Sequence, residues 1–264
     1  MGCGADGGPD RPGVAVIIPA KDEELRVGST VEAARSLPGV DLVLVVDDGS
    51  TDRTGALARE AGARLVRHQH NRGKGAAMET GAEALSRIEV HQNRSGSPPR
   101  HLLFLDADLG RSAADAAPLI EPVVEERADM SIALFPATRA RLGGHGFVVR
   151  LARGGVRRAT GWEPEQPLNG QRCLTRAAFE TARPLARGFG AETGLSIDVL
   201  RANLSLIEVE VPLEHRAIGT DLRAQAHRAR QFTDVARALA VRGAGPVARR
   251  ALSRTGLIRA GAPR

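Results

Sequence analysis

The feature that most constrains the fold of this chain is the stretch HLLFLDADL at residues 101–109. Its apolar residues Leu102 to Leu105 are short and bulky enough to form a strand buried on both faces of a parallel sheet. Asp106 and Asp108 follow at the point where that strand would leave the core. Open α/β sheets bind ligands at this edge. Two aspartates separated by one residue can both turn toward a divalent cation, which often carries a diphosphate.

A single D-x-D triplet is also typical of a solvated turn or of the start of a helix. The triplet alone therefore does not decide between a metal site and an ordinary loop. The order of the other motifs along the chain distinguishes the metal site from the ordinary loop.

The apolar runs predict an alternation of strands and helices. Strands are expected at 14–18, 42–46, 64–66, 102–105, 130–134, 171–175 and 205–211. Helices are expected after residue 24 and at 53–61, 76–88, 113–126, 147–158, 176–182, 191–202 and 221–241. Residues 89–100 are expected to form a surface loop, and the prolines within 162–167 suggest a lid. The alternation predicts an α/β fold with a mostly parallel sheet flanked by helices.

Composition places the chain among globular proteins. Its 264 residues, 42% hydrophobic and 26% charged, are enough for a sizeable core, and we expect a single domain at 14–241 behind a disordered leader at 1–13. Only Cys3 and Cys173 are present, so neither a disulfide framework nor a cysteine metal site is indicated. No run approaches the roughly 18 apolar residues of a membrane span, and the leader lacks the apolar core of a signal peptide. A cytoplasmic location is expected.

Polar loops follow each of the first three strands. They read PAKDEE at 19–24, DDGSTD at 47–52 and NRGKG at 71–75. Lys74 stands between two glycines at a predicted helix start, which suits a phosphate, although the Walker spacing is absent. Each loop taken alone is equally typical of a plain turn with a good helix cap.

The joint order of these three loops and the D-x-D, each after an apolar strand, strongly resembles the family 2 glycosyltransferases and their GT-A-fold relatives. The match covers about residues 14–135. The resemblance implies a nucleotide-sugar donor with Mg²⁺ or Mn²⁺. The implied donor-binding residues are Pro19, Ala20, Glu23, Asp47, Lys74 and Asp106, and the implied metal ligands are Asp106 and Asp108. Residue 22 is Asp where such families often carry Asn.

The later half resembles the glucosyl-3-phosphoglycerate synthase branch, through GFGAE at 188–192 and EHR at 214–216. This resemblance implies that Glu192 holds sugar hydroxyls and that His215 completes the metal site with Asp108. A neutral imidazole at the end of the strand 205–211 would suit that role, whereas a lone histidine is more often a surface or core residue. The polar cluster NGQR at 169–172 is either a sugar-contacting or acceptor-contacting loop or an ordinary return to a strand.

The expected function is a metal-dependent glycosyltransferase that moves a sugar from a nucleoside-diphosphate sugar, most simply a UDP-sugar, to a hydroxyl or phosphate acceptor. Residues 14–135 would bind the donor and 136–241 would form the acceptor side. An inverting reaction needs a carboxylate base, for which Glu192 and Asp198 are candidates, and Lys74 would assist the departing diphosphate. The stereochemistry stays open.

Two rival functions remain. A sugar-phosphate nucleotidyltransferase would need a glycine-rich start after the first strand, where Pro19 to Asp22 stand instead. A non-catalytic basic protein that binds nucleotides or nucleic acid would use the net charge of +6, but the basic C-terminal segment holds a single aromatic, Phe232. The tail 242–264 is either solvated or a peripheral contact to an anionic membrane face. A homodimer stays open.

Overall fold

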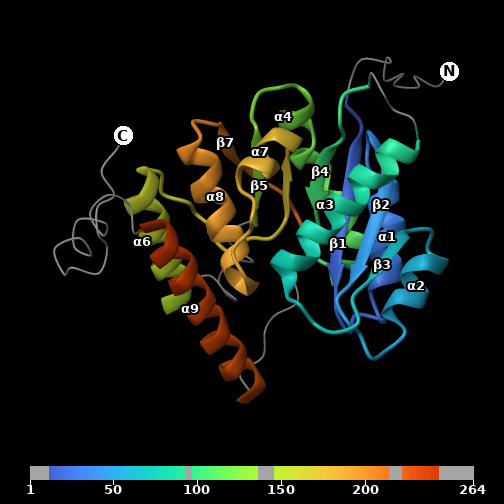
Figure 1. Cartoon of the computed structure of the whole chain (residues 1–264), viewed down its shortest axis with the longest axis horizontal. Coiled ribbons are helices and arrows are strands. Elements are labelled where there is room, and N and C mark those ends of the chain that lie inside the picture. The colour runs from blue at the N-terminus through green and yellow to red at the C-terminus, as the bar shows by residue number, and fades with distance from the viewer. Residues whose placement is uncertain (1–11, 93–96, 136–145, 214–221, 244–264) are drawn as a thin grey trace, which may run out of the picture.

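A seven-stranded sheet runs through the protein (Figure 1). The computed structural model describes residues 12–92, 97–135, 146–213 and 222–243, with side chains of the last range described from residue 229. The strands are β1 Val14–Ala20, β2 Val40–Asp47, β3 Arg64–Arg67, β4 His101–Phe104, β5 Met130–Leu134, β6 Arg172–Leu174 and β7 Leu206–Glu210. All seven strands predicted from apolar runs are present, with the predicted bounds for β5 and ends within a few residues of the prediction for the others.

The strand order is β3-β2-β1-β4-β6-β5-β7. Strands β3, β2, β1 and β4 are mutually parallel, β6 runs antiparallel between β4 and β5, and β7 is parallel to β5. The prediction of an α/β fold with a mostly parallel sheet is confirmed. Because β1 lies between β2 and β4, the loops after these three strands open on the same edge of the sheet.

Helices cover both faces of the sheet. They are α1 Val27–Arg35, α2 Thr54–Glu60, α3 Lys74–His91, α4 Glu121–Val124, α6 Phe147–Thr160, α7 Arg176–Thr181, α8 Ala191–Arg201 and α9 Leu222–Gly243, with 3₁₀ turns η1 Gly110–Leu119 and η2 Gly188–Gly190. Val14, Val16 and Ile18 of β1 pack in the cluster that includes α1 and η1. Ala15 and Ile17 pack in the cluster with α3, α7 and α8. This alternation is what a strand buried on both faces requires.

Helices α6 and α9 form an outer layer against α8, far from β3 (Figure 1). The Gly155 backbone of α6 lies so close to Leu239 of α9 that a Cβ there would overlap the leucine side chain. Phe147 and Phe232 stack with ring centroids 5.4 Å apart. No helix in the described ranges is long and apolar enough to cross a membrane.

Two segments differ from the sequence expectation. The single helix expected at 113–126 is instead the 3₁₀ turn η1 followed by the short α4. Pro118 and Pro122 each remove a backbone donor, so a continuous α-helical ladder cannot form across them. The surface loop expected at 89–100 begins later, because α3 continues to His91. Residues 93–96 lie outside the described ranges.

Helix α3 approaches the sheet through Gly81. A Cβ at this position would lie 2.5 Å from Cγ2 of Ile17 and 3.3 Å from Cγ2 of Val46. Both neighbours are fully buried core residues. A mid-helix glycine lowers helix stability by itself, so its place here reflects the close packing of α3 on β1 and β2.

We expect Gly81→Ala to destabilise the fold by about 1–3 kcal/mol, because overpacking outweighs the gain in helix propensity. Gly154→Ala in α6 is the matched control, since a Cβ there meets nothing within 4 Å. The control should be neutral or stabilise by up to about 1 kcal/mol. Urea unfolding measures both, and equal stabilisation by the two substitutions would contradict the close packing.

Candidate active site

Lys74 joins three segments that are far apart in the sequence. Its Nζ lies 2.6 Å from Oδ1 of Asp106 and 2.9 Å from Oε1 of Glu192. Lys74 begins α3, Asp106 follows β4, and Glu192 lies in the first turn of α8. The structure therefore brings together three residues that the sequence had singled out for one site.

The two carboxylates keep Lys74 charged. Burial opposes the ammonium form, but the charges of Asp106 and Glu192 outweigh burial and raise the pKa of Lys74 above its ordinary value. Glu192 is almost fully buried, with its side chain 5% exposed. The site thus holds a fixed ammonium group at the start of a helix, where an anionic diphosphate is also favoured.

Asp48 fixes the conformation of the loop that immediately precedes Lys74. Its two carboxylate oxygens accept hydrogen bonds from the backbone N–H groups of Arg72 and Gly73, each at 2.8 Å. Nδ1 of His68 lies 2.7 Å from the same carboxylate. Gly73 has a φ of +91°, a backbone conformation that favours glycine. The sequence analysis predicts a role for Asp47 in this loop and not for Asp48. The partners of Asp48, His68 and Gly73, lie 20 and 25 residues further along the chain, so no local pattern marks it.

Asp47 is turned into the protein and is 1% exposed. Its Oδ1 accepts from the backbone N–H of Ser50 at 2.8 Å, and its Oδ2 lies 3.3 Å from Nε of Arg67. These contacts close the turn after β2. A contact between Asp47 and the donor stays a prediction.

The loops after β1 and β2 are tied to each other. The Asp22 N–H donates to Oγ of Ser50 at 3.0 Å, and the Thr51 N–H donates to Oδ1 of Asp22 at 2.8 Å. Asp22 has a φ of +54°, which Asp and Asn tolerate better than other side chains. Hydrogen bonding by Lys21 lowers the pKa of Asp22, so the carboxylate form persists as an acceptor. Asp in place of the usual Asn therefore still braces this loop.

A hollow of about 1040 Å³ opens over these loops. Its lining comes from the end of β1, from the loops after β1, β2 and β3, from the start of α3, from η2 and from α9. The lining residues are Pro19, Ala20, Lys21, Asp22, Asp48, Asn71, Gly73, Lys74, Ala77, Gly188, Phe189, Ala229, Arg230, Thr233 and Asp234. Of the predicted site residues, Pro19, Ala20 and Lys74 line this hollow, and contact of Pro19 and Ala20 with a base stays a prediction. The other predicted residues in the described ranges are not among the lining residues: Glu23, Asp47, Asp106, Asp108, Glu192 and Asp198.

The D-x-D pair offers carboxylate oxygens, the ligands that Mg²⁺ and Mn²⁺ prefer. Asp106 and Asp108 are both partly exposed in the loop after β4. The Asp108 backbone carbonyl accepts from Arg26 at 3.0 Å, which anchors the loop. Within the described ranges no group of three His, Cys, Asp or Glu side chains could hold a metal. His215, the third ligand implied by the resemblance, lies outside those ranges.

The segment 169–172 contacts both Asp106 and Lys74. Nε2 of Gln171 donates to Oδ2 of Asp106 at 2.8 Å. A Cβ on Gly170 would overlap Nζ of Lys74 and lie 3.2 Å from Oδ1 of Asp106. The sequence marks this segment only by its polarity, because its contact with the D-x-D joins residues 65 positions apart.

The Asp198 carboxylate forms an ion pair with Arg242 and does not contact the Lys74 cluster. Its Oδ2 lies 2.8 Å from Nε and 2.5 Å from the second terminal nitrogen of Arg242, which joins α8 to α9. Glu192 is thus the candidate base that the structure places beside Lys74, and a catalytic role for Asp198 stays a prediction.

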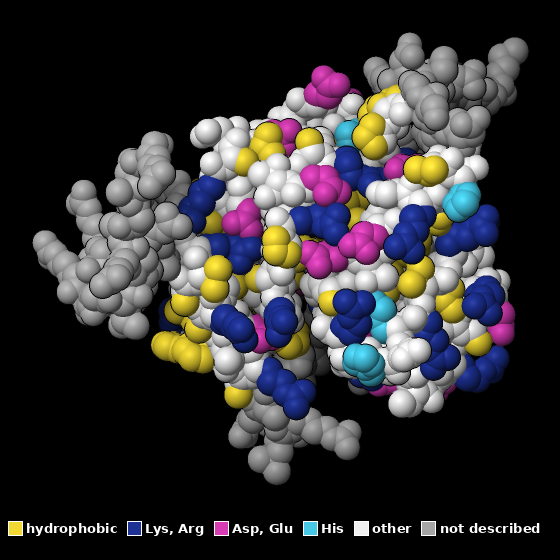
Figure 2. Space-filling view, viewed as in Figure 1, with side chains coloured by type: hydrophobic (Ala, Val, Ile, Leu, Met, Phe, Trp, Pro, Cys, Tyr) yellow, Lys and Arg dark blue, Asp and Glu magenta, His cyan; other side chains and the backbone are white. Residues whose placement is uncertain are grey.

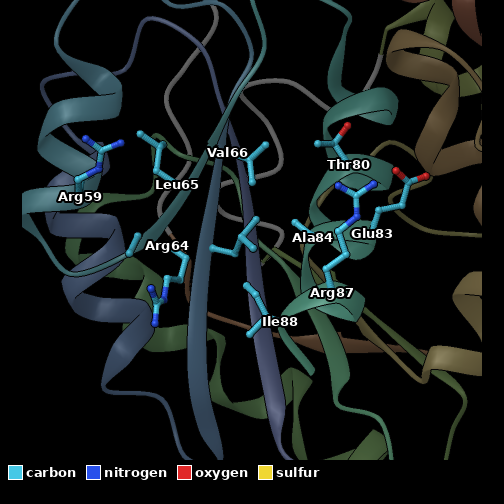
Figure 3. Close-up of a pocket in the computed structure, with 11 residues that line it drawn as sticks. Arg59, Arg64, Leu65, Val66, Thr80, Glu83, Ala84, Arg87 and Ile88 are labelled. Carbon is cyan, nitrogen blue, oxygen red and sulfur yellow. The ribbon is translucent and has the colours of Figure 1, made fainter. Parts of the chain in front are cut away.

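A second hollow, of about 490 Å³, lies at the outer edge of β3 between α2 and α3 (Figure 3). Arg59, Arg64 and Arg87 line it together with apolar side chains. Its one acidic lining residue, Glu83, forms an ion pair with Arg183 at 2.6 Å. This hollow contains no residue of the Lys74 cluster, so the candidate site is the larger hollow at the ends of the strands.

The sheet, the tied loops and the D-x-D define a GT-A glycosyltransferase of the nucleotide-sugar type. Residues 15–144 match the model described as glycosyl transferase family 2. The glucosyl-3-phosphoglycerate synthase of Mycolicibacterium smegmatis is 30% identical over 84% of this chain and 73% of its own length. The chain belongs to the family 2 glycosyltransferases, as the sequence motifs predicted. The rival prediction of a sugar-phosphate nucleotidyltransferase is wrong.

Other relatives extend the comparison. MJ1222 of Methanocaldococcus jannaschii, an uncharacterised protein, is 32% identical over 45% of each chain, so this chain spans less than half of that relative. The glucosyl-3-phosphoglycerate synthase of Mycobacterium tuberculosis, solved with phosphoglyceric acid, has a TM-score of 0.65 and 26% identity over 88% of this chain and 80% of that chain. The same enzyme has been solved with Mn²⁺, UDP and glucosyl-3-phosphoglycerate.

We expect Lys74→Met to destabilise the protein by about 1–3 kcal/mol, since Asp106 and Glu192 lose the ammonium that joins them. The Lys74 side chain is 24% exposed, so the cost lies between that of a surface pair and a buried pair. Lys21→Met is the control, because its ion pair with Asp22 is 37% and 43% exposed. Urea unfolding in EDTA gives both values, and equal losses would argue against a special role for the Lys74 cluster.

Proposed function

We propose that this protein transfers a sugar from a nucleoside-diphosphate sugar, a UDP-sugar, to a hydroxyl or phosphate acceptor with the help of Mg²⁺ or Mn²⁺. The meeting of Lys74, Asp106 and Glu192 beside the large hollow carries the proposal. The related M. tuberculosis enzyme binds UDP and Mn²⁺ in its solved complexes, which supports the choice of donor and cation.

In this proposal the donor lies along the ends of β1, β2 and β4. Pro19 and Ala20 contact the base, and Glu23 and Asp47 contribute to the base and ribose subsite by family resemblance. Lys74 faces the diphosphate, and the first N–H groups of α3 add to the positive field. A cation held by Asp106, Asp108 and His215 would supply further positive charge for the leaving diphosphate.

Glu192 lies at the sugar end of this arrangement. It is buried and bonded to Lys74, so its carboxylate is fixed before substrate arrives. A fixed carboxylate can hold sugar hydroxyls, and in an inverting reaction it can take the proton of the acceptor hydroxyl. In a retaining reaction the departing phosphate would take that proton instead. Asp198, paired with Arg242, is the second candidate base.

A small anionic acceptor of the phosphoglycerate kind is the acceptor that we favour, because the relatives with solved acceptor complexes bind one. The alternative is a lipid-linked phosphate, with peripheral membrane contact through the basic tail at 242–264. All but the first two residues of that tail lie outside the described ranges. A cytoplasmic location and a homodimer belong to the same proposal.

Binding of nucleic acid is less well supported. On the face shown in Figure 2, lysine and arginine side chains are scattered and interleaved with acidic ones, and they form no continuous basic stripe. Nucleic-acid backbones are usually followed by such stripes.

Incubation with a panel of nucleotide sugars tests the proposal. We expect slow release of UDP with Mg²⁺ or Mn²⁺ and none in EDTA. Asp108→Ala should lower this rate by about 100-fold or more, because the diphosphate charge is left uncompensated, and Asp106→Ala should weaken it. Asp115→Ala, at an exposed aspartate of η1, is the control and should keep the rate. Full activity of Asp108→Ala would rule out the metal assignment.

His215 can be tested separately from catalysis. We expect His215→Ala to lower the affinity for Mn²⁺ in the presence of UDP by about tenfold or more, as for loss of a direct ligand. Calorimetric titration measures this, with circular dichroism to show that the variant folds. His91→Ala, at the exposed end of α3, should titrate like the unaltered protein. An unchanged titration of the His215 variant would remove this residue from the site.

A further inference from the structure

Arg172 is a charged residue in the middle of the sheet. It lies in β6, opposite Phe104 of β4 on one side and Ile132 of β5 on the other. Its exposed fraction is 0%, and it is among the largest fully buried side chains in the described ranges. Burial of a guanidinium costs folding free energy unless hydrogen bonds or nearby opposite charges compensate for the lost hydration.

The hydrogen bonds of Arg172 end on two segments of the candidate site. One terminal nitrogen donates to the backbone carbonyl of Glu192 at 3.1 Å and lies 3.4 Å from Oγ of Ser196. The other donates to the backbone carbonyl of Asn169 at 2.5 Å. Arg172 therefore joins the first turn of α8 to the loop that precedes β6.

Both joined segments hold a partner of the Lys74 cluster. Glu192 carries the carboxylate that meets Lys74 at 2.9 Å. The Asn169 loop carries Gln171, whose amide meets Asp106 at 2.8 Å. Asp106 in turn meets Lys74 at 2.6 Å. The contacts form a closed ring, the Lys74 ring, in which Arg172 is fully buried.

Arg172 also supplies charge. Burial lowers the pKa of Arg172 to about 10, while the charges of Glu192, Asp106 and Glu208 act in the opposite direction. The guanidinium therefore stays protonated at neutral pH. No described carboxylate lies within ion-pair distance of it, so its charge acts through space on the two carboxylates of the site.

We propose that Arg172 is a positioning residue, which acts by fixing the Glu192 turn and the Gln171 loop so that both carboxylates meet Lys74 in the geometry that sugar transfer needs. This role rests on the proposed glycosyltransferase function. Arg172 does not line the large hollow, so it acts through Glu192 and Gln171 and not by contact with the donor.

Arg176 provides a matched control four residues further on. Its side chain is 12% exposed, and it bonds to Ser86 at 2.8 Å and to Glu89 at 3.1 Å on α3. Like Arg172, it has a buried Nε without a hydrogen-bond partner in the described ranges. Its partners, Ser86 and Glu89, are not members of the Lys74 ring. Substitution of Arg176 therefore measures the effect of losing a largely buried guanidinium in general. Substitution of Arg172 measures the effect of losing the one that belongs to the ring.

The experiment compares Arg172→Met, Arg172→Lys and Arg176→Met in the full chain. The readouts are kcat and KM for UDP-sugar hydrolysis per folded molecule, UDP affinity, and hydrogen exchange of the amides at 188–196. We expect Arg172→Met to lower kcat by about 30-fold or more with KM changed by less than about threefold, because small misplacements of reacting groups are costly. Arg172→Lys should recover part of kcat.

Hydrogen exchange provides a readout that does not need activity. In Arg172→Met the amides at 188–196 should exchange about tenfold faster or more, since the first turn of α8 loses its anchor. Arg176→Met should leave both kcat and this exchange unchanged. If Arg172→Met does not fold, Arg172→Lys carries the same comparison.

The outcomes are distinct. Unchanged kcat per folded Arg172 variant, unchanged exchange at 188–196, or an equal fall in Arg176→Met would overturn the positioning role. An unaltered protein that releases no UDP from any nucleotide sugar would overturn the proposed function instead, and the exchange comparison would still decide whether Arg172 anchors this turn.

Discussion

The bridge from Lys74 to Asp106 and Glu192 is the interaction on which the site depends. It unites the start of α3, the end of β4 and the start of α8. These segments meet because β4 pairs with β1 and because β6, which leads toward α8, pairs with β4. A parallel sheet thus converts remote positions in the sequence into neighbours at one edge. The Lys74 ammonium then stabilises this contact electrostatically, since the carboxylates of Asp106 and Glu192 would otherwise repel each other.

Much of the fold could be predicted from the sequence because the apolar runs are unambiguous. The run Met130–Leu134 forms β5 with the same bounds as predicted, and the D-x-D follows β4 as expected. The 3₁₀ turn η1 was missed, because helical periodicity was given more weight than the two prolines. Local patterns report which segments are buried, but they do not report how a helix adjusts to a lost backbone donor.

The site could be predicted only in part. Lys74, Asp106 and Glu192 stood in motifs and were found, whereas the choice between Asp47 and Asp48 depends on which way each side chain leaves the end of a strand. Asp48 turns toward His68 and the Arg72 backbone, and Asp47 turns toward Ser50. The partner of Asp198 is 44 residues away in α9, a pairing that no local pattern shows.

The position of α9 has a consequence for how the protein matures. Asp234 of this helix accepts a hydrogen bond from Phe189 at 3.1 Å, and its neighbours form one wall of the hollow where a donor would bind. The loops that begin the hollow are translated some two hundred residues earlier. On the ribosome, a nascent chain can therefore pair β1 with β2 and β4 long before the hollow has all of its walls. The wall that α9 contributes to the hollow is therefore completed only after this helix has been translated and has docked.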